Sequence, residues 1–165
     1  MIRPARMDDL PEIERVYEAA RAFMRAHGNP HQWSDWGYPE HALLVKDIEK
    51  RQLYVIQEAG AMHGVFAFIL GDDPTYAVIY DGQWPNALPY GTIHRIAGDG
   101  TVRGLVQKAL DFALGFTDEV RADTHHDNFP MQGALQKCGF RRCGIIHLAS
   151  GDPRIAYQFS KEANA

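Results

Sequence analysis

The stretch YGTIHRIAGDGTVRGLVQKALDFAL, residues 90–114, decides how this chain is expected to fold. Residues 93–97 are expected to form a buried strand, and residues 101–115 carry apolar positions at helical spacing. Three glycines at the junction permit a tight turn. A helix N-terminus presents unpaired backbone N–H groups and partial positive charge, so this turn suits an anion such as phosphate. Many strand-to-helix turns use glycine without binding a ligand, and that alternative stays open.

The composition is that of one soluble globular domain, which we expect to span residues 1–165. This length is enough to bury a core without disulfides or a structural metal. The net charge of −4 gives no basis for binding nucleic acid or an anionic membrane. No apolar run is long enough to span a bilayer, and the first residues lack the apolar core of a signal peptide. We therefore expect a cytoplasmic protein.

The chain has two cysteines, Cys138 and Cys143. Their spacing fits no common zinc motif, and the sequence contains no second pair. Free thiols are the interpretation that we favour over a redox or catalytic role.

The rest of the pattern predicts an alternation of strands and helices. Strands are expected at residues 2–5, 52–58, 61–71, 93–97, 119–123, 140–148 and 154–159, with a candidate short strand at 76–80. Helices are expected at residues 10–28, 40–50, 101–115 and 128–138, the first capped by Asp8 or Asp9. Ala59 and Gly60 mark the turn of a hairpin. This order implies an α/β (α+β) fold with a mixed sheet and helices on both faces.

The element order and three local motifs resemble the GNAT superfamily of acyl-CoA-dependent N-acyltransferases. IRPARMDDLPEIERVYEAA (residues 2–20) looks like the family's IRPA-x-x-D-x-x-x-I opening. TVRGLV (101–106) occupies the place of its Q/R-x-x-G-x-G/A loop, and NFPMQGALQKCGF (128–140) resembles its N-x-x-A-x-x-x-Y-x-x-x-G-F element. QWSDWGYP, YGTIHRIA, THHDNFPMQ and LQKCGF together resemble a bacterial subgroup of loosely defined substrate. The resemblance implies a mostly antiparallel central sheet.

The resemblance also implies acetyl-CoA as co-substrate. A backbone N–H near Ile96 and Ala97 would polarise the acetyl carbonyl, and residues 98–106 would hold the pyrophosphate. Asn128 would bind the pantetheine arm through its side-chain amide. The cofactor contacts implied in this way are Ile96, Ala97, Gly98, Thr101, Val102, Arg103, Gly104, Leu105, Val106, Asn128 and Met131.

The chain departs from the family pattern at three positions. Thr101 replaces the first Gln or Arg of the phosphate loop, and the bulkier Val106 replaces its last Gly or Ala. Backbone amides make most phosphate contacts in such loops, so side-chain changes are tolerable if the turn is kept. Leu135 occupies the slot of the tyrosine that protonates the departing thiolate in many members. Another group, water or unassisted departure would have to replace it.

Attack by an amine requires a base that removes the amine's proton, and His94 is the first candidate. Strand alternation places it on the face of Tyr90, Thr92 and Ile96. A buried, hydrogen-bonded strand histidine is the competing interpretation. His125 and His126 are further candidates for the base. We expect no metal site at this pair, because adjacent positions point to opposite sides and no third ligand is evident.

Aromatic residues in polar, turn-rich segments are candidates for the wall of an acceptor pocket. The candidates for substrate binding are Trp33, Trp36, Tyr38, Tyr80 and Trp84. The competing interpretation assigns them to the ordinary core.

The leading functional hypothesis is transfer of an acetyl group from acetyl-CoA to a primary amine of a small molecule or peptide. A catalytically weak acyl-CoA-binding sensor is the alternative, favoured by Leu135 and the altered loop. A dinucleotide-binding Rossmann protein is disfavoured, since no G-x-G-x-x-G with a downstream acid appears. Exposed aromatics would suit a homodimer.

Overall fold

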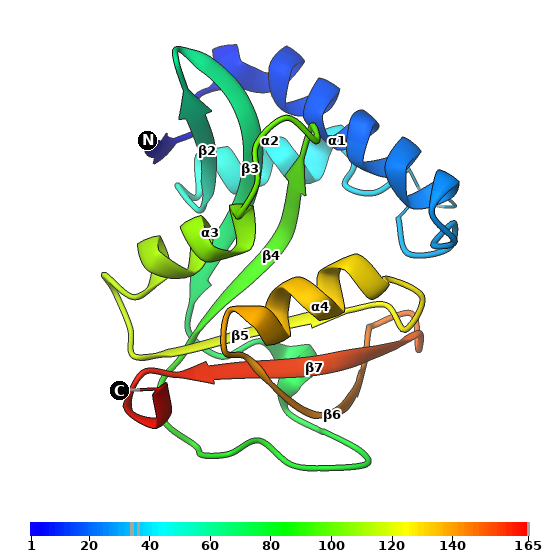
Figure 1. The fold of residues 1–165 in the computed structure, drawn as a ribbon, viewed down its shortest axis with the longest axis vertical. Coiled ribbons are helices and arrows are strands. Elements are labelled where there is room, and N and C mark those ends of the chain that lie inside the picture. The colour runs from blue at the N-terminus through cyan, green and yellow to red at the C-terminus, as the bar shows by residue number, and fades with distance from the viewer. Residues whose placement is uncertain (34, 36, 165) are drawn as a thin grey trace. The chain divides into compact units, whose positions relative to one another are not determined.

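The computed structural model describes residues 1–33, 35 and 37–164 (Figure 1). The strands follow the order β1-β2-β3-β4-β5-β7-β6 in a seven-stranded sheet, in which the β4–β5 pair is parallel and β1–β2, β2–β3, β5–β7 and β6–β7 are antiparallel. The mixed, mostly antiparallel sheet is therefore confirmed. The chain divides into two compact units, Met1–Phe68 with Arg95–Leu105, and Ile69–His94 with Val106–Ala165. The single domain stays a prediction.

The first unit combines two helices with an antiparallel sheet. Its elements are β1 (Ile2–Pro4), a 3₁₀ turn (Met7–Asp9), α1 (Leu10–Ala26), α2 (His41–Glu49), β2 (Leu53–Glu58), most of β3 (Ala61–Leu70) and the second half of β4 (Gly91–Gly98). One hydrophobic cluster joins the inner faces of both helices to β2 and β3, with Tyr17, Leu44 and Val65 at most 1% exposed. Burial of these apolar stripes accounts for the amphipathic pattern of the helices.

The predicted hairpin is confirmed. β2 and β3 are joined by Ala59 and Gly60, whose φ angles are 50° and 79°. Positive φ at both positions matches the twist of a two-residue turn to the twist of its strands. Beside the turn, the register shifts by one residue between Ile56 and Gln57.

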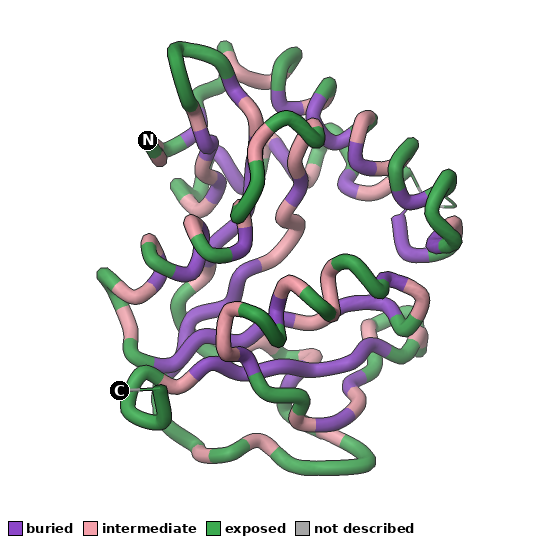
Figure 2. The backbone as a smooth tube through the Cα atoms, in the orientation of Figure 1, coloured by how far each residue is buried: buried purple, intermediate pink, exposed green. Residues whose placement is uncertain are grey.

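The second unit contains the C-terminal strands and two further helices. Its elements are a 3₁₀ turn (Pro74–Tyr76), the first half of β4, α3 (Leu105–Ala113), β5 (Glu119–Thr124), α4 (Phe129–Lys137), β6 (Arg141–His147), β7 (Pro153–Ser160) and a final 3₁₀ turn (Glu162–Asn164). β5 and β7 are buried along almost their whole length (Figure 2). Cys138 and Cys143 are free thiols, as predicted, and burial raises the pKa of both.

Two predicted elements differ from the structure. No strand runs through residues 76–80, because Pro74 starts a 3₁₀ turn and Tyr80 makes only an isolated bridge with Ile145. The third long helix begins at Leu105 rather than at 101, since Gly104 has a φ of 75° and the preceding residues form a turn. Apolar spacing does not indicate where a residue takes a left-handed backbone conformation. The sequence therefore predicted one strand that is absent and one helix that is too long.

Asp9 occupies the N-cap position of α1, as expected, but its side chain makes no capping hydrogen bond. The Asp9 carboxylate instead accepts a hydrogen bond from the Arg6 N–H at 2.7 Å. It also forms two hydrogen bonds with the Arg3 guanidinium, each 2.8 Å long, and these hold its pKa below the usual range. Asp9 thus ties the first strand to the turn that leads into α1. In the described part of the chain, no helix is long and apolar enough to cross a membrane.

Arg95 lies within β4 and has a left-handed backbone conformation, with a φ of 51°. Its Nε and Nη2 each donate to the Asp47 carboxylate at 3.0 Å, and its Nη1 donates to the Tyr38 hydroxyl at 3.1 Å. The buried Tyr17 hydroxyl donates to the Arg95 carbonyl at 2.7 Å. A left-handed non-glycine residue costs about 1–3 kcal/mol, and this set of bonds offsets that cost. A left-handed residue perturbs the regular alternation of side chains, so the sequence-based assignment of His94 and Ile96 to one face stays a prediction.

We predict that Asp47→Asn lowers the free energy of unfolding by about 3–5 kcal/mol, because it leaves the Arg95 guanidinium buried without a counter-charge. Urea unfolding at pH 7 measures this loss. Asp118→Asn is the matched control, since that carboxylate is 75% exposed and faces Lys161 at 3.8 Å. The control is expected to change stability by less than about 0.5 kcal/mol. Equal effects of the two variants would contradict the assigned role.

Candidate functional site

The His94 imidazole contacts the carboxylate of Asp73, which lies in the irregular segment between β3 and β4. Its Nε2 lies 2.9 Å from Oδ2 of Asp73, and the two side chains are 19% and 18% exposed. A neutral imidazole that donates Nε2–H to the carboxylate keeps its lone pair on Nδ1. Among the described residues, Nδ1 of His94 has no hydrogen-bond partner, so this nitrogen is available to accept a proton.

Asp73 is held in its ionised form. Burial alone would raise the pKa of its carboxyl, but hydrogen bonds from His94 and from the Thr75 hydroxyl and N–H outweigh this and lower the pKa to about 2. The Asp73 N–H donates to the Tyr90 hydroxyl at 2.8 Å. The carboxylate is therefore charged at every physiological pH and fixed in position beside the imidazole.

A second carboxylate in the same unit binds a buried phenol. The Tyr76 hydroxyl donates to Oδ2 of Asp123 at 2.6 Å, and Tyr76 is 2% exposed. Burial, together with this negative neighbour, raises the pKa of Tyr76 well above its usual range. Its ring centroid is 6.1 Å from that of His94. Tyr76 therefore stays protonated and forms part of the surroundings of the His94 imidazole.

Arg121 and Asp123 share a strand, but Arg121 bonds other groups. Its guanidinium lies over the rings of Trp84 and Tyr90, 3.9 Å from each centroid. Its Nε donates to Oε1 of Gln158 at 2.8 Å. Burial lowers the pKa of this guanidinium, and the two ring faces partly compensate for the lost hydration.

The glycine-rich turn after β4 has an internal carboxylate. Oδ1 of Asp99 accepts hydrogen bonds from the N–H and hydroxyl of Thr101, at 3.0 and 2.5 Å, and Nδ1 of His63 lies 2.6 Å from that hydroxyl. Burial would raise the pKa of Asp99, but these hydrogen bonds lower it. The amide of Thr101 is thus already used within the loop.

The glycines of this turn leave open space above the main chain. Gly100 and Gly104 have φ angles of 84° and 75°, and a Cβ added at either would meet nothing within 4 Å. At Gly98 an added Cβ would lie 2.2 Å from the Leu105 side chain. The open space at Gly100 and Gly104 leaves room for an anion to approach the main chain of the turn. Val106 is buried on the inner side of α3, whereas Val102 is partly buried and Arg103 is exposed.

The remaining expected cofactor contacts lie in the strand and in α4. Ile96 is partly buried and Ala97 is buried in β4. Asn128 caps α4, its Oδ1 accepting from the Met131 N–H at 3.1 Å. Leu135 is 3% exposed and belongs to the core. The cofactor roles assigned from the sequence stay predictions.

The end of β5 departs from two expectations for the His125–His126 pair. The buried Thr124 hydroxyl has no hydrogen-bond partner in the described part of the chain. The His125 and His126 rings stack 4.2 Å apart rather than pointing to opposite sides, because β5 has already ended at Thr124. Asp127 is a third candidate ligand, contrary to the expectation that none lies near the pair, and the candidate ligand atoms of the three residues lie within 4.8 Å of one another. In this turn, Nδ1 of His125 accepts from the Asp127 N–H at 3.0 Å.

The aromatic candidates for the acceptor pocket lie in different surroundings. Trp33 is 7% exposed in the core beside Tyr17, and Tyr38 bonds Arg95. Tyr80 is exposed, with its ring centroid 5.0 Å from that of His147. Trp84 lies on Arg121 and donates from Nε1 to the Tyr76 carbonyl at 2.9 Å. Trp36 lies outside the described residues. A substrate role for any of the five stays a prediction.

Three members of this site were missed from the sequence. Asp73 and Tyr76 lie beside His94, and Asp123 accepts a hydrogen bond from Tyr76. Of these four residues, only His94 was a catalytic candidate in the sequence analysis. The available signal was the Asp-Pro-Thr sequence at 73–75, a turn motif whose carboxylate caps its own backbone. Together these groups fix the orientation of the His94 imidazole and leave its Nδ1 able to accept a proton.

The comparisons place the chain among known folds. A GNAT-family acetyltransferase from Streptococcus agalactiae is 34% identical, with a TM-score of 0.88 over 98% of this chain and 95% of that one. A GNAT-family acetyltransferase from Bacillus cereus has 20% identity and a TM-score of 0.63 over 98% and 96%. The ribosomal-protein-S18-alanine N-acetyltransferase of Escherichia coli has 14% identity and a TM-score of 0.61 over 97% and 92%. No protein-family model and no curated protein matches the chain.

We predict that Asp73→Asn lowers the free energy of unfolding by about 1–2 kcal/mol at pH 7. Because the folded pKa of about 2 lies below the ordinary value of 3.8, this stabilisation is present above pH ~4 and is lost as the pH falls toward 2. Urea unfolding at pH 7 and pH 3 measures the trend. Asp72→Asn changes an exposed neighbour and is expected to have no such effect. A difference from the wild type that stays constant with pH would exclude this role for Asp73.

Proposed function

Because the chain belongs to the GNAT family of acetyltransferases, we propose that it transfers an acetyl group from acetyl-CoA to a primary amine of a small molecule or peptide. The observation that carries this proposal is the His94–Asp73 pair immediately before the left-handed Arg95 in β4. Direct attack requires a neutral amine, a polarised thioester carbonyl and a fixed approach of the two groups. The residues along β4 are suited to the first two requirements.

His94 is proposed as the general base. Its Nδ1 has no partner among the described residues, whereas its Nε2 bonds the Asp73 carboxylate. The carboxylate fixes the ring orientation and stabilises the positive charge that develops when Nδ1 takes the amine's proton. This arrangement needs no metal ligand and no second titrating residue.

The backbone beyond Arg95 is proposed to polarise the acetyl carbonyl. A left-handed residue disturbs the regular hydrogen-bond pattern of a strand. A backbone amide that follows it can therefore be left without a partner in the sheet and can donate to a ligand. The Tyr17 hydroxyl and Asp47 carboxylate hold Arg95 in this conformation. A donor that is fixed before the substrate binds does not have to reorganise during the reaction.

Acetyl-CoA supplies an activated acyl group whose leaving group is a thiolate. The open turn at Gly100 and Gly104 is proposed to hold its pyrophosphate, and Asn128 to bind its pantetheine arm. Leu135 is buried and has no proton to donate, so we propose that the thiolate departs without a side-chain acid. A thiol with a pKa of about 8.5 is a sufficient leaving group for this route.

A catalytically weak acyl-CoA-binding sensor is the second candidate. Two observations favour it, the buried Leu135 in the tyrosine slot and the Thr101 amide that bonds Asp99 within the loop. A sensor would bind the cofactor without turnover.

The first test is calorimetric titration with acetyl-CoA, with coenzyme A and ATP as comparators, followed by thiol-release assays on a panel of amines. Binding of both acyl-free and acylated coenzyme A, no binding of ATP, and turnover with an amine would support the enzyme. Binding without turnover on any amine would support the sensor. A folded protein that binds neither form would overturn both candidates.

We predict that His94→Gln lowers kcat by about 10²–10⁴-fold, the usual contribution of a general base. The dissociation constant for acetyl-CoA is expected to stay within about twofold of the wild type, since a base is not required for cofactor binding. His27→Gln, at an exposed position after α1, is the matched control and should retain full activity. A variant at His94 that keeps its kcat would remove this residue from the mechanism.

A further inference from the structure

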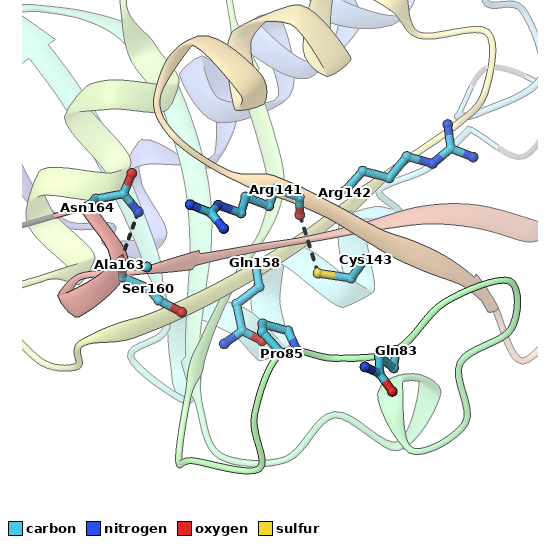
Figure 3. A pocket seen from close by; sticks show the side chains of 9 residues that line it. All are labelled: Gln83, Pro85, Arg141, Arg142, Cys143, Gln158, Ser160, Ala163 and Asn164. Atoms are coloured by element: carbon cyan, nitrogen blue, oxygen red, sulfur yellow. Dashed lines mark hydrogen bonds between the residues drawn. The ribbon is translucent and has the colours of Figure 1, made fainter.

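The second unit contains a polar pocket on the side of the sheet that carries Gln158 (Figure 3). Its volume is about 350 Å³, within the size range of sites for small metabolites. The pocket is lined by Gln83, Pro85, Arg141, Arg142, Cys143, Gln158, Ser160, Ala163 and Asn164. Nine residues from four segments thus enclose a space that the acetyl-transfer proposal does not use.

The lining of the pocket is positively charged. Arg141 and Arg142 belong to the lining, and none of the lining residues is acidic. Arg141 pairs with Gln158 in the register, whereas the Arg142 side chain points away from the other labelled residues (Figure 3). Both arginines are exposed and neither forms an ion pair among the described residues. Amide, hydroxyl and thiol groups supply the other polar atoms, including the Cys143 thiol, which donates to the Arg141 carbonyl at 3.3 Å.

A third guanidinium lies behind the pocket wall. The pairing register aligns Arg121, Gln158 and Arg141 across β5, β7 and β6, in one row on one face. Arg121 is 5% exposed and has no carboxylate partner in the described part of the chain. A buried cation without a counter-charge is costly, so a negative group nearby would stabilise it.

Gln158 links Arg121 to the Glu119 carboxylate, so the two charged groups do not bond each other directly. Its Oε1 accepts from Arg121, while its Nε2 donates to Oε2 of Glu119 at 2.6 Å. Glu119 also accepts from the Ser160 hydroxyl at 2.5 Å. The Glu119 carboxylate is therefore bound by Gln158 and Ser160 rather than by Arg121.

We propose that this pocket binds a small molecule through an oxyanion, a carboxylate or a phosphate group. Arg141 supplies the charge-assisted hydrogen bonds, Arg121 adds charge from behind, and Gln158 holds the wall in place. The site lies within one unit and is independent of acetyl transfer.

The test is a titration of the isotope-labelled protein with inorganic phosphate and, separately, with succinate, followed by NMR at constant ionic strength adjusted with sodium chloride. The expected result is a saturable shift of the Gln158 side-chain amide and of the Ser160 and Asn164 backbone amides with at least one probe. The stronger probe distinguishes a phosphate ligand from a carboxylate ligand. Arg141→Gln is expected to weaken that binding about tenfold, the usual consequence of losing one charged hydrogen bond.

Arg25→Gln is the matched control, because it removes one exposed guanidinium from α1 with the same change in net charge. This variant should bind like the wild type, and the spectrum of each variant reports its own fold. Shifts confined to the turn at Gly100 and Gly104 would overturn the proposal. Shifts reproduced by sodium chloride alone, or equal affinity in Arg141→Gln and wild type, would overturn it as well.

Discussion

The bidentate ion pair between Arg95 and Asp47 is the constraint on which the first unit depends. Asp47 comes from α2, Tyr38 from the segment before it and Tyr17 from α1, and all three converge on one left-handed residue of β4. Asp47 is 1% exposed, so its charge is tolerated only while the guanidinium is present. Packing of the helices and the conformation of the strand are therefore determined together, which gives the backbone beyond Arg95 a fixed geometry.

In the second unit, the buried guanidinium of Arg121 is stabilised by a different set of partners. Arg121 has two aromatic faces, a carbonyl and an amide oxygen as partners, where Arg95 has a carboxylate. Ring faces and neutral acceptors offset less of the charge than a bidentate carboxylate does. Charge is thus neutralised around Arg95 but remains available around Arg121.

The sequence predicted most of the regular structure, because apolar periodicity decides which segments become buried helices and strands. The hairpin at Ala59 and Gly60 follows a local rule and was found in the structure, whereas the cap at Asn128 was not predicted. The position of Arg95 in left-handed space was not predictable, since no local pattern marks it. His94 was identified by residue type alone, and its carboxylate partner was missed.

The missed contacts share a physical cause. His94 pairs with Asp73 across 21 positions, Tyr76 with Asp123 across 47 and Arg95 with Asp47 across 48. The first two link strands to the irregular residues 72–90, where no hydrophobic period specifies a position. In such a segment the buried polar groups determine the conformation, because an unpaired carboxylate or phenol would be costly. Substitutions there would consequently act on His94 through Asp73 and Tyr76, even where they change no residue that touches a substrate.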